Sequence, residues 1–482
     1  MSKTVTITAA FGDGVGPEIM DAVLHILKES KAPIRVETIE IGEKLYKKNY
    51  SSGIAEDTWD ALARTKVLLK APITTPQGGG YKSLNVTLRK ALGLYSNVRP
   101  SISYHPFLET LHPNLDVVIV RENEEDIYAG IEYRQTHNMY ESIKLISRVG
   151  SEKIIRYAFE YAVKNNRKTV TCFSKDNIMK FSDGIFHKVF DEVAKEYPNI
   201  KSNHYIIDIG TAKLATSPDI FDVIVTSNLY GDIISDVTSE ISGSVGLAGS
   251  ANIGEEYAMF EAVHGSAPDI AGQNIANPSG LLNAAVMMLI HVGLGSYATL
   301  IENAWKKTIE DGVHTADIYS PKISSKKVGT KEFAQEVVLR FGQKPTKLRS
   351  VNYPDATEST ISKRTYSINT QEKKTLVGVD VFVQSSAKNA HELADILSKA
   401  KHSLELKTIA AKGLMLWPRK EPAPFLSDHW CARYMNKDGS VISHDEVASL
   451  LASLANTGVD FIKTENLYNF DGNRGFSLAQ GE

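Results

Sequence analysis

The amino-acid sequence predicts an α/β fold, followed by a smaller α+β domain near the C-terminus. Short runs of β-branched and apolar residues alternate with longer stretches whose apolar residues recur at helical spacing. Residues 343–374 are instead rich in Ser, Thr, Lys and Pro and separate two well-patterned regions, which indicates a linker. A chain of 482 residues is long enough for several compact units. We therefore expect one domain over residues 1–342 and another over residues 375–482.

The first predicted element is a strand over residues 4–11, which leads through a glycine-rich turn into a helix. The turn, GDGVGPE at residues 12–18, places Pro17 at a first helical position. Four apolar residues then lie at helical spacing on one face: Ile19, Val23, Ile26 and Leu27. The turn is similar to a dinucleotide-binding loop, but the third glycine of G-x-G-x-x-G is missing. A structural turn is the alternative.

Later elements follow the same rhythm. Further strands are predicted at residues 67–69, 116–120, 169–172 and 222–226, and a helix at residues 152–163. Beyond the linker, a strand is expected over residues 376–383 and a helix over residues 389–400. Ser443 and Glu446 have the spacing of a capping box, which predicts the start of a last helix.

Composition excludes several classes of function. Fifty-four basic and fifty-seven acidic side chains give a net charge of -3, without the excess of positive charge that nucleic acids or anionic membranes attract. Cys172 and Cys431 match no metal-ligand or redox spacing, so we expect reduced thiols. The N-terminus has no secretion signal, and the apolar segment 284–293 is too short to span a bilayer. We therefore expect a cytoplasmic protein with no nucleic-acid or membrane partner.

A group of polar and basic residues indicates a binding site for a small polyacid. Arg89, Arg99 and Arg121 can form paired hydrogen bonds with several carboxylates, while Ser83 and Asn85 supply shorter ones. Taken one at a time, the arginines are better explained as solvated side chains of helices and loops.

Two acids and a lysine indicate metal-assisted proton transfer. Asp232 and Asp236 stand four apart at the start of a predicted helix, so both carboxylates share one face and suit Mg²⁺ or Mn²⁺. Lys175 follows a predicted strand, and a lysine beside a divalent cation can act as a base. The alternatives are a solvated acidic helix face and an ordinary surface lysine.

The ordered motifs resemble those of the isocitrate and isopropylmalate dehydrogenases, which oxidise and decarboxylate 2-hydroxy acids. The resemblance covers residues 1–342 and lies in GDGVGPE, TTPQGGGYKSLNVTLRK, NVRP, RENEEDIYAGIEY, KDNIMKFSDG, NLYGDIISD, GSANIG and HGSAPDIAG. It implies that family's fold, which is not a Rossmann fold, with a large part over residues 1–98 and 250–342 and a small part over residues 99–249. The extension after the linker resembles that of a longer bacterial subgroup, in which it helps subunits associate.

The resemblance also implies an activity. Ser83 and Asn85, in the form S-L-N-V-x-x-R, are similar to the isocitrate branch, where they contact the extra carboxylate of the substrate. The implied reaction is the oxidative decarboxylation of isocitrate to 2-oxoglutarate and CO₂ in the tricarboxylic acid cycle, with reduction of NAD or NADP. The alternatives are a homoisocitrate or isopropylmalate dehydrogenase and a non-catalytic regulatory paralogue. A paralogue of that kind is expected to have lost some of Tyr128, Lys175 and the aspartates.

Residue by residue, the resemblance assigns roles to the same side chains. Arg89, Arg99 and Arg121 hold the substrate carboxylates, and Tyr128 and Lys175 form the acid–base pair. The implied ligands of Mg²⁺ or Mn²⁺ are Asp208, Asp232 and Asp236. Lys175 and Asp208 come from the partner subunit in this family, which implies a homodimer with shared active sites.

The nicotinamide cofactor is expected to bind along the loop HGSAPDIAGQNIANPSG, residues 264–280. Asp269 and Ile270 replace the Lys-Tyr pair of similar NADP-dependent enzymes, and a carboxylate there repels a 2′-phosphate. The sequence therefore favours NAD over NADP. Further positions that the resemblance assigns to the cofactor are Thr75, Asn177, Glu261, His264, Gly265 and Asn277.

Overall fold

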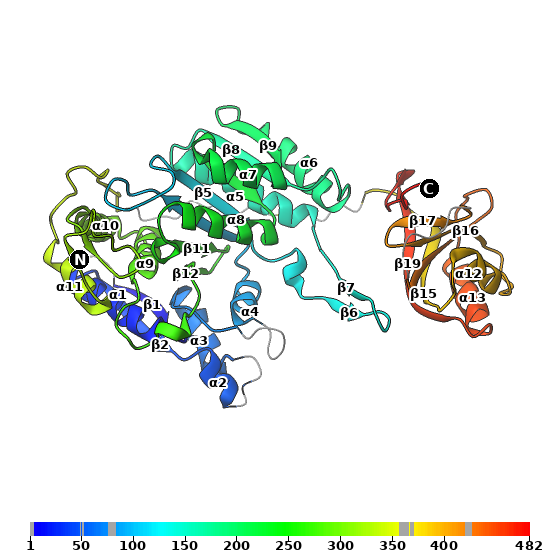
Figure 1. Ribbon diagram of the computed structural model, residues 1–482, viewed down its shortest axis with the longest axis horizontal. Helices are drawn as coiled ribbons and strands as arrows, with labels where there is room; N and C mark the ends of the chain where they lie inside the picture. The colour runs from blue at the N-terminus through cyan, green and yellow to red at the C-terminus, as the bar shows by residue number, and fades with distance from the viewer. Residues whose placement is uncertain are drawn as a thin grey trace. The chain divides into compact units, whose positions relative to one another are not determined.

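The computed structural model describes residues 4–48, 50, 53–75, 83–355, 366, 371–419 and 427–482. The chain forms two compact units (Figure 1). The first unit comprises Met1–Tyr128, Leu145–Ile178 and Asp183–Thr365, and the second comprises Ala129–Lys144, Met179–Ser182 and Tyr366–Glu482. The glycine-rich part of the motif at residues 76–82 and much of the linker predicted over residues 343–374 lie outside the described residues. The domain boundaries drawn from the sequence therefore stay predictions.

A ten-stranded mixed sheet forms the centre of the first unit, within its described residues. In spatial order its strands are β2 (Ile34–Ile39), β1 (Val5–Ala10), β3 (Val67–Lys70), β12 (Ala258–Ala262), β11 (Gly249–Ile253), β4 (Ser96–Ile102), β5 (Asp116–Glu122), β10 (Val223–Thr226), β8 (Thr169–Ser174) and β9 (Lys201–Ile206). The four central strands β12, β11, β4 and β5 are antiparallel to their neighbours within this group. All other neighbouring strands of the sheet are parallel. The predicted α/β class is confirmed.

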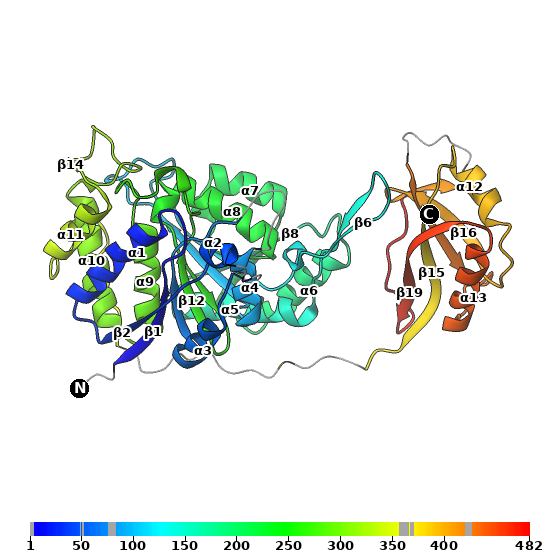
Figure 2. The same cartoon turned by 90° about the horizontal axis from the view of Figure 1, so that it is seen from below.

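Helices cover both faces of this sheet (Figures 1 and 2). They are α1 (Gly16–Glu29), α2 (Glu43–Lys47), α3 (Glu56–Thr65), α4 (Leu84–Ala91), α5 (Arg148–Lys164), α6 (Ser182–Ala194), α7 (Ile207–Thr216), α8 (Asn228–Ile241), α9 (Ser279–His291), α10 (Gly295–Glu310) and α11 (Thr330–Leu339). Short 3-10 turns are η1 (Ile127–Ala129), η2 (Pro218–Ile220), η3 (Val245–Leu247) and η4 (Pro268–Ile270), and two short strands, β13 (Val313–His314) and β14 (Lys326–Lys327), pair with each other. The stripe predicted on α1 is buried, and Pro17 occupies its first turn.

The alternation of side chains along the strands gives the two faces of the sheet different interiors. On one face Leu69, Val98 and Val120 belong to a single continuous core that α1, α5, α6, α9, α10 and α11 cover. On the other face there are two separate cores. Leu68 packs with residues of α3 and α4, and Ile119 packs with residues of α7 and α8.

The middle strands between these two cores carry only polar side chains on that second face. These polar side chains are Ser250 and Asn252 of β11 and Asn97, Arg99 and Ser101 of β4, and all of them are buried. Lys70 is the last residue of the flanking strand β3, and Arg121 and Glu261 are the last but one of β5 and β12; all three lie on the same face and are also buried. Because buried polar groups need partners, this gap between two apolar cores is where a polar site is expected.

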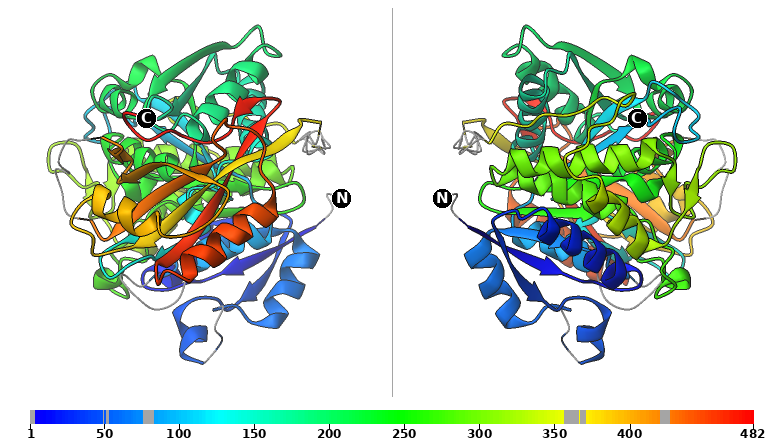
Figure 3. Two further views of the ribbon diagram at one scale, coloured as in Figure 1. Left: turned by 90° about the vertical axis from the view of Figure 1, so that its right-hand side faces the viewer. Right: turned by 90° about the vertical axis from the view of Figure 1, so that its left-hand side faces the viewer.

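In the described part of the second unit, a six-stranded antiparallel sheet carries two helices on one face (Figures 2 and 3). Its strands in spatial order are β17 (Leu414–Trp417), β16 (Glu405–Ala411), β18 (His429–Met435), β15 (Lys374–Gln384), β19 (Asp460–Phe470) and β20 (Asn473–Arg474), and its helices are α12 (Ala390–Leu397) and α13 (His444–Ala455). Without β17 and β20, the order of elements is that of a β-α-β-β-α-β unit. The capping box of Ser443 and Glu446 is present, which confirms the predicted helix start. A hairpin of β6 (Glu132–Arg134) and β7 (Tyr140–Ser142) also belongs to this unit.

Among the described residues, no helix combines the length and the apolar composition that crossing a membrane requires.

Candidate active site

A cavity of about 230 Å³ opens in the first unit at the polar gap of the sheet. Ten residues singled out in the sequence line it: Ser83, Asn85, Arg89, Arg99, Arg121, Tyr128, Asp232, Glu261, His264 and Gly265. They come from segments that are far apart in the chain, including α4, β4, β5, η1, α8 and β12. The fold therefore gathers all five predicted substrate residues around one space.

Asp232 is the centre of the charged network in this cavity. Its Oδ1 accepts hydrogen bonds from Arg121 and, at 3.2 Å, from Arg99, while its Oδ2 accepts from the Tyr128 hydroxyl at 2.5 Å. Gly231 allows this approach, because a Cβ there would lie 2.6 Å from Cγ of Arg121. One carboxylate thus orients two guanidinium groups and one phenol.

Positive charge is in excess around Asp232. Burial, and then the charges of Arg99 and Arg89, lower the pKa of Arg121 to about 9. Burial by itself would raise the pKa of Asp232, but Arg121 and Arg99 hold it below its ordinary value. A ligand that brings carboxylates into the cavity would relieve the repulsion among the three arginines.

A second buried network lies beside the first. Glu261 forms ion pairs with Lys70 at 2.6 Å and Arg89 at 2.9 Å, and accepts a hydrogen bond from Asn252 at 2.8 Å. Lys70 lines the cavity and is only 1% exposed, yet sequence reasoning missed it. The available signal was a lysine that ends an apolar strand, since β3 and β12 pair in parallel with Lys70 directly opposite Glu261.

Three polar atoms of the cavity residues are buried and lack a partner within the described protein. They are Oδ1 of Asn85, Nε of Arg89 and Nε2 of His264. Burial lowers the pKa of His264, so its ring is neutral and bonds through Nδ1 to the carbonyl oxygen of Gly265. Because such atoms are costly when unsatisfied, the cavity suits a ligand with both donor and acceptor groups.

The other predicted residues lie outside the cavity lining. They are Thr75, Asn177, Lys175, Asp208, Asp236, Asp269, Ile270 and Asn277. Lys175 and Asp208 form an ion pair with each other at 3.1 Å. Asn277 donates a hydrogen bond to Asp317, and Asn177 is exposed in the turn after β8.

The acids of α8 fit a divalent cation. Asp232 and Asp236 lie on one face of the helix, and Oδ1 of Asp236 is 3.9 Å from Arg99. Partial burial, together with the like charge of Asp232, raises the pKa of Asp236 despite Arg99. A divalent ion relieves this repulsion, and carboxylate oxygens are the ligands that Mg²⁺ and Mn²⁺ prefer.

Glu122, next to Arg121 on β5, makes stability depend on pH. Burial raises its pKa from 4.5 to about 8, although the backbone N–H groups of Glu124 and Glu125 act in the opposite direction. Since the folded state keeps a proton that the unfolded state releases, this contribution is full below about pH 4.5 and is lost as the pH rises through about 8. We expect wild type to lose about 1 kcal/mol per pH unit relative to Glu122→Gln across that window. Urea unfolding of both proteins at several pH values checks this, and parallel curves would contradict it.

Comparison with known proteins extends the resemblance to the whole chain. A family model described as isocitrate/isopropylmalate dehydrogenase matches residues 6–337, and one described as the C-terminal domain of bacterial isocitrate dehydrogenase matches residues 374–482. The isocitrate dehydrogenase (NADP) of Rickettsia bellii is 69% identical over 100% of both chains. That of Thermus thermophilus is 40% identical over 99% of this chain and 96% of the relative. A crystal structure of a protein from Thermus thermophilus matches with a TM-score of 0.93 at 39% identity, covering 99% of this chain and 96% of the other.

The preference for NAD that was predicted from Asp269 was wrong, because both of these relatives are named as NADP enzymes. The prediction weighed one carboxylate of the loop alone. In the structure, Asn274 of the same loop accepts hydrogen bonds from the backbone N–H groups of Thr330 and Lys331. The segment just before Thr330 also carries the exposed side chains of Lys326 and Lys327, so Asp269 is not the only charged residue to be weighed in this part of the fold.

Proposed function

Because this chain belongs to the isocitrate/isopropylmalate dehydrogenase family, we propose that it is an isocitrate dehydrogenase that oxidises isocitrate with NADP and releases CO₂ and 2-oxoglutarate. The enzyme is an oxidoreductase that acts on an alcohol and decarboxylates the product. The observation that carries this function is the cavity lined by Arg89, Arg99 and Arg121, in which Arg99 and Arg121 bond to the carboxylate of Asp232 and Arg89 bonds to Glu261.

The charge of the cavity matches isocitrate, which has three carboxylates. The arginines bind two of them through paired hydrogen bonds, and the neutral Ser83 and Asn85 face the third. The unpartnered Nε–H of Arg89 and the amide NH₂ of Asn85 can donate hydrogen bonds to it. An apolar substituent in place of the third carboxylate would leave these groups unsatisfied, which disfavours isopropylmalate.

The metal site that we propose consists of Asp232 and Asp236 of one chain with Asp208 of the partner subunit. When bound there, Mg²⁺ or Mn²⁺ lowers the pKa of the substrate hydroxyl and stabilises the negative charge that decarboxylation leaves. The protein's own groups position the substrate and move protons. Lys175 of the partner subunit serves as the base for the hydroxyl proton, while the arginines hold the carbon skeleton in place.

Tyr128 is the proposed acid that protonates the carbon left after CO₂ departs. Burial raises the pKa of Tyr128, so its hydroxyl stays protonated at neutral pH and donates to Asp232. The ring also lies against Arg121, 4.9 Å from its guanidinium carbon, which fixes its direction.

Tyr128→Phe is expected to separate the two half-reactions. The rate of NADP reduction by isocitrate should fall less than the rate of 2-oxoglutarate formation. The two rates should differ by roughly a factor of ten to a hundred, because only the later protonation needs the hydroxyl. Rapid-mixing measurements that follow NADPH and product separately test this. Equal losses in both steps would show that Tyr128 only holds Asp232.

The proposed homodimer accounts for Lys175 and Asp208, which pair with each other outside the cavity lining. If each chain completes the site of its partner, Asp208→Asn and Asp232→Asn chains are separately inactive. After both are unfolded and refolded together, about a quarter of the wild-type activity should return, since half of the dimers then contain one intact site. A mixture that stays inactive would refute shared sites.

We also propose that the second unit supports this association. A truncated chain of residues 1–345 tests this through its oligomeric state.

The substrate test compares isocitrate, homoisocitrate and isopropylmalate with NADP and with NAD. We expect the highest kcat/KM for isocitrate with NADP. A preference for either of the other acids would replace the substrate assignment, and a folded protein without turnover on any of them would indicate a non-catalytic paralogue.

A further inference from the structure

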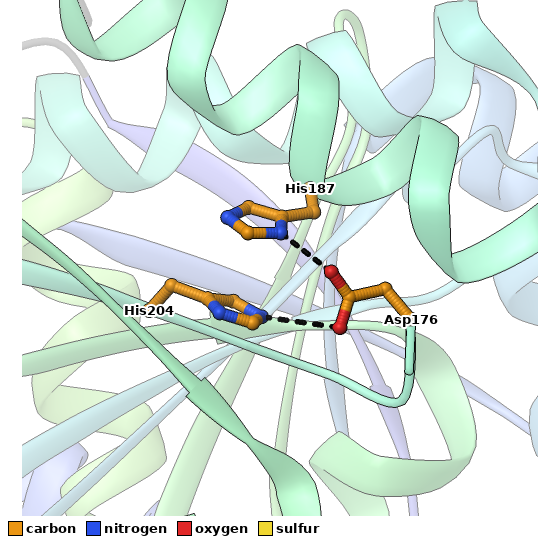
Figure 4. A group of neighbouring side chains, drawn as sticks. All are labelled: Asp176, His187 and His204. Atoms are coloured by element: carbon orange, nitrogen blue, oxygen red, sulfur yellow. Dashed lines mark hydrogen bonds and ion pairs between the residues drawn. The ribbon is translucent and has the colours of Figure 1, made fainter. Parts of the chain in front are cut away.

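A second group of metal-ligating side chains lies outside the proposed catalytic set (Figure 4). Asp176 comes from the turn after β8, His187 from α6, and His204 from β9. Figure 4 shows both imidazole rings directed toward the carboxylate of Asp176. Because β8 and β9 pair in parallel, with Cys172 opposite His204, the fold brings the three residues to one place.

The distances between the donor atoms are close to those of a metal site. Nδ1 of His187 is 2.7 Å from Oδ2 of Asp176, and Nε2 of His204 is 3.9 Å from Oδ1. One ligand atom from each residue lies within 4.8 Å of the other two. Donors bound to one ion at about 2.0–2.2 Å stand roughly 3–3.6 Å apart, so small side-chain rotations suffice.

A bound cation would stabilise the two imidazole rings more than their contact with each other does. They stack with their centroids 3.6 Å apart, which two protonated imidazoles would resist by repulsion. Burial, and then the nearby charge of His187, lower the pKa of His204. The carboxylate of Asp176 thus lies beside two imidazoles that can each supply a nitrogen donor.

Supporting groups are also present. Oδ2 of Asp191 lies 3.7 Å from Nε2 of His187, the nitrogen that faces away from Asp176, which is the usual place for a carboxylate that orients a metal-bound histidine. The Ser174 hydroxyl lies 2.8 Å from Nε2 of His204 and can bond to a water on the ion. The side chains of Asp176, His187 and His204 are 21–25% exposed, so an ion has access.

We propose that Asp176, His187 and His204 form a binding site for a divalent transition-metal ion of the zinc type, with water as the fourth ligand. Two imidazoles and one carboxylate suit Zn²⁺, whereas Mg²⁺ prefers oxygen ligands alone. The ion joins the turn after β8 to α6 and β9. Its role is structural, since it holds the turn that carries Lys175 and Asn177.

Zinc titration calorimetry on the full-length protein, with excess Mg²⁺ present to fill the carboxylate site of α8, tests this. Wild type should bind one zinc ion per chain. His204→Gln and Asp176→Asn should weaken that binding by at least about tenfold. The control is His25→Gln, which removes an exposed histidine of α1 and should leave the affinity unchanged. Equal affinity in His204→Gln and wild type would overturn the proposal.

A measurement on wild type alone covers the case in which the variants do not fold. Diethyl pyrocarbonate modifies accessible histidines, and peptide mass spectrometry locates the modified residues. Zinc should slow modification of His187 and His204 by at least about tenfold while His25 reacts as before. If all three react at the same rates with and without zinc, the site does not exist. Neither experiment requires turnover, so the outcome is independent of the proposed activity.

Discussion

Asp232→Asn is expected to lower kcat/KM for isocitrate by roughly a thousandfold while the protein stays folded. The carboxylate accepts hydrogen bonds from Arg99, Arg121 and Tyr128 at once. An amide carries no charge, and its NH₂ group would face a guanidinium, so the arginines lose both their neutralising partner and their orientation. One proposed metal ligand is lost as well. Steady-state kinetics with NADP, together with circular dichroism of the variant, measure the effect.

The matched control is Glu240→Gln, which makes the same change of charge on an exposed position of α8. It should retain nearly the whole wild-type activity. If Asp232→Asn kept more than about a tenth of the wild-type kcat/KM, the central place of this carboxylate in the site would be lost.

Local signals in the sequence were sufficient for the secondary structure that surrounds the site. The helix after GDGVGPE, the acidic face of α8 and the capping box at Ser443 all depend on residues within one or two turns of each other. These interactions involve neighbours in the sequence, so the spacing of residue types is enough to predict them.

The burial of the arginines could not be read in the same way. Arg99 and Arg121 are 5% and 1% exposed, although each is compatible with a solvated position in its own segment. Their place follows from the antiparallel pairing of β4 with β5, which puts Asn97 opposite Arg121. It also follows from the order of strands, which leaves a polar gap between two apolar cores. Sheet order is a long-range property that a single sequence does not display.

The cofactor prediction from Asp269 also depended on long-range contacts that the sequence does not display, and in this case the prediction was wrong. The residue was weighed against a 2′-phosphate as if its loop stood alone, because the segment with Lys326 and Lys327 lies more than fifty residues further along the chain. Hydrogen bonds of Asn274 with Thr330, Lys331 and Glu332, and of Thr330 with Ala276, join the two segments. Cofactor preference depends on the summed field of all nearby charges, so one side chain was an insufficient basis.

Lys70→Met is expected to destabilise the fold by about 3–5 kcal/mol, because it leaves a buried carboxylate with one cation in place of two. The ion pair of Lys70 with Glu261 measures 2.6 Å, and the two side chains are 1% and 6% exposed. Burial by itself would raise the pKa of Glu261, yet Lys70 and Arg89 hold it well below its ordinary value, so this acid is charged in the folded protein. Methionine has a similar length but no charge. Urea unfolding followed by circular dichroism gives the free energy of unfolding.

Two further variants separate the loss of charge from a loss of packing. In Lys70→Met combined with Glu261→Gln, the unpaired charge is removed, so a substantial part of the stability should return even though both ionic groups are gone. Lys48→Met instead removes an exposed lysine that pairs with Glu40 at 3.0 Å, with both side chains largely in solvent. Stability should change little in that control, because water already screens the pair. If the double variant were as unstable as the single one, the shape of the Lys70 side chain, and not its charge, would be what the site requires.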